Sequence, residues 1–164
     1  MILLNTWTMR AVTASAAALA LAGCGSSDDP AALRTDLEAL DAEMQADLAG
    51  CAVDTLVTSH DASGYLADRY GLEVVGVSGL GPSAEPDPAQ LAEITALVRE
   101  RGVSTVCTET LVDPAVAETV AEEAGVQTAV LDPLEGLTGA SAGGDYLEVM
   151  RATLATLQEG QSCA

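Results

Sequence analysis

Apolar and polar residues alternate along this chain with two different periods. Short runs rich in β-branched residues, with a period of two, are typical of strands, and between them apolar residues recur every three or four positions, as on a helix. The predicted strands cover residues 53–58, 72–77, 103–108 and 127–131. The helices predicted to follow them cover residues 62–70, 88–101, 113–124 and 145–157. This alternation indicates a parallel sheet with right-handed crossovers.

A longer amphipathic segment precedes the first strand. Asp29 and Pro30 are typical of a helix start, with an acidic N-cap and a proline in the first turn. One apolar stripe then runs to Gly50 and consists of Leu33, Leu37, Leu40, Met44 and Leu48. We therefore expect an α/β fold with a single parallel four-stranded sheet flanked by helices, in which a long helix over residues 30–50 precedes a domain over residues 51–164.

The first residues have the pattern of a secretory leader. Residues 11–22 are uncharged and mostly apolar, but this stretch is too short to span a membrane. The sequence Leu-Ala-Gly-Cys at residues 21–24 resembles the bacterial lipoprotein box, in which the cysteine becomes the lipid-modified N-terminus. We expect a signal peptide over residues 1–23, a lipidated Cys24, a tether over residues 24–29, and an extracytoplasmic protein anchored to the cell membrane.

The charge of the chain restricts its partners. Six basic residues stand against 25 acidic ones, for a formal net charge of −19. Such a chain will not hold a nucleic-acid backbone, which needs basic side chains. Because anionic lipids would also repel it, its attachment to a membrane must come from the lipid anchor.

Three cysteines follow the leader, and outside the cytoplasm two of them are expected to form a disulfide. A bridge between Cys51 and Cys163 would tie the end of the chain to the start of the first strand. Cys107 lies within an apolar strand and is expected to be a buried small hydrophobe. The sequence favours the pair Cys51 and Cys163, and the pair Cys107 and Cys163 remains the alternative.

Three polar residues each follow a different predicted strand. His60, the only histidine of the chain, follows the first strand, Glu109 follows the third and Asp132 follows the fourth. Because parallel strands all end at one edge of a sheet, an imidazole and two carboxylates should share that edge. Nitrogen and oxygen ligands of this kind suit Zn²⁺ or Mn²⁺. Each carboxylate also has an ordinary alternative, since Asp132 could cap the turn before Pro133 and Glu109 could accept bonds from loop amides.

The sequence shows no motif that would indicate an enzyme. Ser59, His60 and Asp61 are the residue types of a hydrolase triad, but neighbouring side chains on a strand point to opposite faces and cannot converge. The sequence contains no Gly-x-Ser-x-Gly elbow, no phosphate-binding loop and no Gly-x-Gly-x-x-Gly motif. We therefore expect a binding protein.

Four segments resemble a known family in order and spacing: TSHDASGYL at residues 58–66, GLGPSAEP at 79–86, TETLVDP at 108–114 and LDPLEGL at 131–137. They are similar to the C-terminal lobe of the ZnuA-like substrate-binding lipoproteins of zinc and manganese ABC transporters, from about residue 33 onward. The resemblance implies two α/β lobes joined by a rigid long helix, with metal held between them. It implies His60 and Asp132 as metal ligands with Glu109 beside them, Zn²⁺ or alternatively Mn²⁺ as cargo, and an ABC permease as partner.

The sequence departs from this family in three respects. The lipoprotein box runs almost directly into the linking helix, so that the first lobe, with its two metal-binding histidines, is expected to be missing. Ser63 and Cys107 stand where the family usually has aromatic residues. The resemblance therefore implies a truncated metal-binding component of an importer. The alternative is a non-transporting remnant, or a half-lobe that docks to a partner without metal affinity of its own.

Without the first lobe, the apolar stripe of the long helix would be partly uncovered. An exposed apolar surface of this kind favours association. We therefore expect either a separate first lobe or self-association to cover it.

Overall fold

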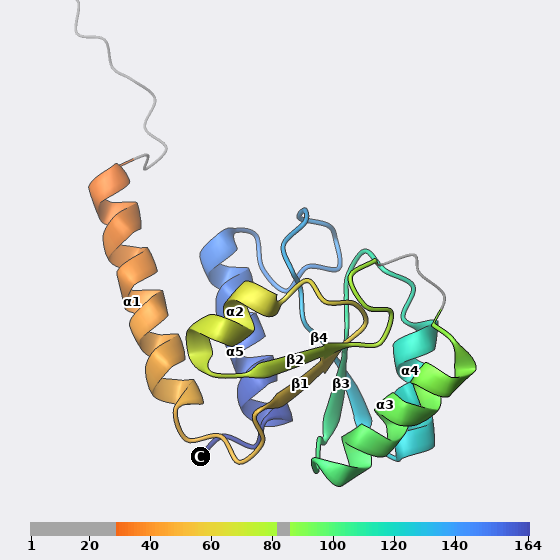
Figure 1. The fold of residues 1–164 in the computed structure, drawn as a ribbon. Coiled ribbons are helices and arrows are strands. Elements are labelled where there is room, and N and C mark those ends of the chain that lie inside the picture. Colours follow the sequence, from red (N-terminus) through yellow and green to blue (C-terminus); the bar gives the residue numbers. More distant parts are fainter. Residues whose placement is uncertain (1–28, 82–85) are drawn as a thin grey trace, which may run out of the picture.

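A single parallel sheet forms the centre of the computed structural model, which describes residues 29–81 and 86–164 (Figure 1). Its strands follow the order β2-β1-β3-β4, and all pairs are parallel. They are β1 (Thr55–Thr58), β2 (Glu73–Gly76), β3 (Thr105–Thr108) and β4 (Gln127–Val130). The predicted four-stranded parallel sheet is thus confirmed. The predicted signal peptide and Cys24 lie outside the described residues.

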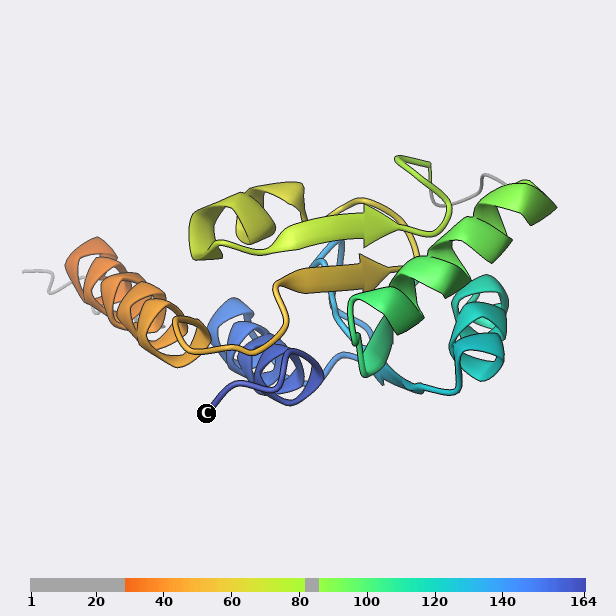
Figure 2. The ribbon, with the colours of Figure 1, turned by 60° about the horizontal axis from the view of Figure 1, so that its bottom comes forward.

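Helices cover both faces of the sheet (Figure 2). They are α1 (Pro30–Leu48), α2 (Gly64–Tyr70), α3 (Pro88–Glu100), α4 (Ala115–Ala124) and α5 (Tyr146–Gly160). The pair α3 and α4 packs on one face, and α1 and α5 pack on the other. Among the described residues, no helix is both long enough and apolar enough to cross a membrane.

Local sequence signals set the helix boundaries. The side chains of Asp29, Asp87 and Asp145 each accept a hydrogen bond from a backbone N–H in the first turn of α1, α3 and α5. Gly71 and Gly125 end α2 and α4 in the left-handed conformation that glycine adopts without steric cost.

The two central strands feed two hydrophobic clusters. In β1, Val57 packs into the cluster under α3 and α4, whereas its neighbour Leu56 packs into the cluster under α1 and α5. Val106 and Cys107 divide in the same way in β3. Burial on both faces is typical of parallel strands and fixes the direction in which the strand ends point.

Only the second half of α1 is covered. Leu40, Met44 and Leu48 are buried against α5, but Leu33 is 52% exposed and Leu37 is also exposed. The first half of the helix extends away from the body of the domain (Figure 1). The apolar stripe predicted from the sequence is therefore only half used within the described part of the chain.

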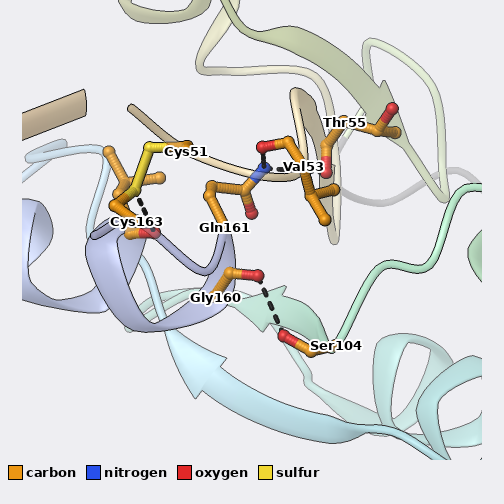
Figure 3. Close-up of a disulfide and its surroundings, with 8 residues drawn as sticks. Cys51, Val53, Thr55, Ser104, Gly160, Gln161 and Cys163 are labelled. Carbon is orange, nitrogen blue, oxygen red and sulfur yellow. Dashed lines mark hydrogen bonds between the residues drawn. A yellow bond between two sulfur atoms is a disulfide. The ribbon is translucent and has the colours of Figure 1, made fainter. Parts of the chain in front are cut away.

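The end of the chain is fastened to the segment before β1 (Figure 3). A disulfide joins Cys51 and Cys163, the favoured of the two pairings considered from the sequence. Beside it, the Gln161 amide donates hydrogen bonds to the carbonyls of Val53 and Thr55, at 3.2 and 2.9 Å. Cys107 remains a free, buried cysteine.

Candidate metal centre

His60 lies on a tightly held turn after β1. The Thr58 hydroxyl donates to the His60 carbonyl at 2.6 Å, and the Ser59 amide donates to the Cys107 carbonyl at 3.0 Å. The Asp61 amide donates to the Gly79 carbonyl at 2.7 Å. The bonding partners lie in β3, in the turn after β2 and within the His60 turn itself, and they fix the backbone on either side of the imidazole.

Gly76, at the end of β2, makes this turn possible. A Cβ atom at position 76 would lie 2.6 Å from the Asp61 nitrogen and 2.9 Å from the His60 carbonyl carbon. Real Cβ atoms do not approach backbone this closely, so any larger residue would push the turn away. The absence of a side chain at Gly76 therefore lets β2 pack directly against the His60 backbone.

Glu109, which follows β3, holds the His60 ring. Its Oε1 lies 2.7 Å from His60 Nδ1 and accepts a hydrogen bond from the His60 backbone amide at 3.2 Å. Since Oε1 already acts as an acceptor, the simplest arrangement has the Nδ1 proton donated to it. His60 Nε2 then carries the lone pair that can bind a metal ion.

Both members of this pair are buried, with His60 only 4% exposed. Burial raises the pKa of the Glu109 carboxyl, and the neighbouring His60 partly offsets this effect. The second carboxylate oxygen, Oε2, is buried and has no hydrogen-bond partner among the described residues. The pair is thus a low-dielectric site in which an added cation would interact strongly.

Asp132 reaches the same edge of the sheet after β4. Its Oδ1 accepts a hydrogen bond from the Leu134 amide at 2.8 Å, so the turn-capping role considered from the sequence is present. Leu134 has a positive φ of 60°, an unfavourable conformation for a side chain of this size. The other oxygen, Oδ2, is buried without a partner among the described residues, and such an atom is normally satisfied by a bonded group.

The sheet order decides which of the predicted residues meet. Because β3 lies between β1 and β4, the ends of β1 and β4 are two strand spacings apart, or about 10 Å. His60 and Glu109 are in contact, whereas no hydrogen bond or ion pair within the described ranges joins Asp132 to either. Nor do these ranges contain a group of three ligand-type side chains that could hold a metal. The edge therefore presents two ligand-type side chains that share no hydrogen bond within the described ranges.

A pocket of about 360 Å³ opens beside Asp132, between α2 and α5. Its lining includes Ser63, Tyr65, Arg69 and Met150. Arg69 makes two hydrogen bonds to Asp41 of α1, so its charge is already paired. His60 does not line this pocket. The pocket therefore reaches the carboxyl edge of the sheet from the Asp132 side only.

The residues that support the His60 turn were not predicted from the sequence. Thr58 and Ser59 contribute hydroxyl groups that donate hydrogen bonds, Ser59 also contributes its backbone amide, and Gly76 contributes the absence of a side chain. None of these roles follows from the residue type alone. The one available signal was the glycine at the end of a predicted strand, which often marks a close backbone approach.

The fold and the edge residues define an open parallel α/β domain with an imidazole and a carboxylate at the carboxyl edge of its sheet. The sequence model of the family described as "Zinc-uptake complex component A periplasmic", ZnuA, matches residues 27–160. The chain therefore belongs to the ZnuA family.

Relatives of known sequence and structure agree with this assignment. The zinc-binding lipoprotein AdcA of Streptococcus pneumoniae is 42% identical over 125 residues, which cover 75% of this chain and 25% of AdcA. The high-affinity zinc uptake system protein ZnuA of Bacillus subtilis is 38% identical over 105 residues, covering 63% of this chain and 33% of that protein. The chain thus spans about a quarter to a third of the curated relatives it matches.

Two solved structures show the same fold. The laminin-binding protein Lbp of Streptococcus pyogenes superposes with a TM-score of 0.72 at 37% identity, covering 80% of this chain and 51% of Lbp. The Zn(II)-bound ZnuA-like domain of S. pneumoniae AdcA superposes with a TM-score of 0.64 at 40% identity, covering 80% of this chain and 50% of that domain.

Proposed function

We propose that this chain is an extracytoplasmic zinc-binding component of an ABC importer, and that His60 and Asp132 are its zinc ligands. The observation that carries the proposal is the buried, unpartnered Oδ2 of Asp132, at the same sheet edge as an imidazole whose ring is already fixed. Zinc satisfies such an oxygen at little cost, because it binds neutral imidazole and carboxylate oxygen together. The names of AdcA and ZnuA, which refer to zinc binding and zinc uptake, support the same cargo.

Glu109 acts in this proposal as a positioning residue. Metal-binding histidines usually donate the proton on their other nitrogen to a carboxylate, which fixes the tautomer and strengthens the ligand. The 2.7 Å separation between Glu109 Oε1 and His60 Nδ1 provides that arrangement and leaves Nε2 for the metal. Glu109 therefore lies beside the metal rather than on it.

The chemistry required is capture and release, with no covalent step. An imidazole with a carboxylate favours Zn²⁺, whereas Mn²⁺ prefers sites richer in oxygen and is the alternative cargo. Delivery to a permease requires the protein to remain at the membrane surface, for which the predicted lipid on Cys24 and the tether over residues 24–29 would serve.

Zinc calorimetry tests the proposal on an untagged chain starting at residue 24 and carrying Cys24→Ser. We expect saturable zinc binding that weakens at least about tenfold in His60→Ala and in Asp132→Asn, since each change removes one ligand. Asp61→Asn is the matched control, because it removes a carboxylate beside His60 that is not a proposed ligand.

Two results would contradict the proposal. Binding that is unchanged in His60→Ala would show that zinc sits elsewhere. No saturable binding at concentrations on the order of tens of micromolar would favour the alternative function, a non-transporting half-lobe that docks to a partner.

A further inference from the structure

Five of the eight exposed large apolar side chains among the described residues lie in the segments that follow the carboxyl ends of the strands. We call this set the apolar rim, and its members are Tyr65, Leu80, Leu111, Leu137 and Tyr146. Each lies in a loop that follows a strand or at the start of the helix after it. Tyr65 is 96% exposed and Leu80 is 82% exposed. Apolar groups concentrated around a polar site are typical of a surface that another protein covers.

The metal edge inside this rim holds too few ligands for zinc. Zinc in proteins takes four ligands, or three and a water molecule. One chain offers His60 and Asp132, and the sequence contains no second histidine. A twofold axis through the metal doubles each ligand and gives two imidazoles and two carboxylates, a complete tetrahedral set.

We propose that two copies of this chain bind face to face across their apolar rims, with one zinc ion held by His60 and Asp132 of both copies. This inference rests on the proposed function, because it uses the same two ligands. The chain covers 51% of Lbp and 50% of the ZnuA-like domain of AdcA, so two copies supply about the length of one solved relative.

Helix α1 fits the same arrangement. It precedes β1 in the chain, and its uncovered first half extends away from the body of its own domain (Figure 1). In a face-to-face dimer this half would lie along the flank of the partner copy. The exposed side chains of Leu33 and Leu37 would then be covered as well.

The charge of the chain makes this dimer depend on metal. Each copy has a net charge of −19, and Asp61, Asp68, Asp113 and Glu135 lie in or beside the loops of the rim. Without metal, two such faces repel each other. The two positive charges of zinc offset the two Asp132 carboxylates and remove repulsion at the centre of the contact.

Native mass spectrometry and sedimentation velocity test the proposal with ZnCl₂ as the probe. The chain used starts at residue 24, carries Cys24→Ser and includes every described helix and strand. We expect monomers in chelator and, with zinc, dimers that contain one zinc ion per two chains. His60→Ala and Asp132→Asn should both abolish the zinc-dependent dimer, so that two separate variants report on the ligands.

A rim variant separates dimer formation from metal binding. Leu111→Glu leaves both ligands in place and should weaken the zinc dimer by about tenfold or more. Gln127→Glu adds the same charge at an exposed position at the opposite end of the sheet, and should leave the dimer unchanged.

The other possible results would overturn the dimer, the metal bridge or the proposed function. A monomer with one zinc ion bound through His60 would overturn the dimer, leave the proposed function standing and favour a separate protein as the partner. A dimer that forms without zinc, or with zinc in His60→Ala, would overturn the metal bridge. No zinc binding at all would overturn the proposed function together with the dimer.

Discussion

At the scale of single residues, the site depends on one carboxylate oxygen. Glu109 Oε1 accepts from the backbone amide of His60 and lies 2.7 Å from Nδ1 of its ring, so it fixes the backbone and the imidazole together. A ring fixed in this way loses less conformational freedom when it binds metal. Glu109 should therefore contribute to zinc affinity without touching zinc.

Replacing Glu109 with glutamine measures this contribution. Glu109→Gln keeps the size of the side chain but removes the charge that favours a proton on Nδ1, so zinc affinity should fall by about 10- to 100-fold. Competition with a chelator of known affinity gives the value. Glu122→Gln, which changes an exposed acidic residue in the last turn of α4, is the control. Equal affinities for the wild-type chain and Glu109→Gln would remove Glu109 from the site.

Cys107 offers a second prediction at this scale. Burial raises the pKa of its thiol to about 12, with a further contribution from the Glu109 charge. At pH 8 about one such thiol in ten thousand is ionised, against about a quarter of thiols with the ordinary pKa of about 8.5. In a chain with Cys24→Ser, we expect no reaction with a thiol reagent in the folded state and one thiol per chain after denaturation. Rapid reaction of the folded chain would show that Cys107 is accessible.

At the scale of elements, the end of α5 completes the start of β1. The Gln161 side chain is buried and satisfies the carbonyls of Val53 and Thr55, while the Val53 amide donates to the Gln161 carbonyl. The C-terminal segment thus replaces part of a neighbouring strand. Together with the disulfide, this clasp holds the start of the strand that leads to His60.

Removing the Gln161 amide should destabilise the domain. Gln161→Ala leaves two carbonyl oxygens with fewer partners and opens a small cavity, so the free energy of unfolding should fall by about 1–3 kcal/mol. Urea denaturation measures the change. Gln45→Ala, on the exposed face of α1, should change stability by less than about 0.5 kcal/mol. Similar values for both variants would show that the clasp does not contribute to stability.

The order of strands and helices was predictable from sequence, but some boundaries were not. The first strand was expected from residue 53, and it begins at Thr55 because the Val53 amide pairs with Gln161 instead of a strand. The third was expected from residue 103, and it begins at Thr105 because the Val103 amide pairs with the Val98 carbonyl at the end of α3. The spacing of apolar residues identifies a helix or a strand. The residue at which that element begins depends on backbone hydrogen-bond partners that lie outside the segment.

The candidate site was predictable to a similar degree. Parallel strands place His60, Glu109 and Asp132 along one edge whatever the order of the strands. Which of these side chains are in contact depends on that order. Glu109 meets His60 because β3 lies next to β1 in the sheet. The contribution of Gly76 depends on the path of the β2 end, and the sequence signals it only as a glycine at the end of a predicted strand.

At the scale of the whole molecule, two apolar surfaces remain exposed in the described part of the chain. The residues of the apolar rim follow the carboxyl ends of the strands, as His60 and Asp132 do, and the uncovered first half of α1 extends away from the body of the domain (Figure 1). The described part of the chain also satisfies most of its basic side chains internally, as in the pairs of Arg69 with Asp41 and Arg151 with Glu43. The remaining acidic excess keeps the molecule soluble and makes association without metal unfavourable.

X-ray absorption spectroscopy at the zinc edge tests the central claim, that His60 and Asp132 bind zinc, most directly. His60 is the only histidine of the chain, so imidazole scattering from an untagged sample can come from no other residue. We predict nitrogen and oxygen ligands at about 2.0–2.2 Å with imidazole scattering, which disappears in His60→Ala. A zinc–sulfur distance of about 2.3 Å, or a spectrum without imidazole in the unmodified chain, would contradict the claim.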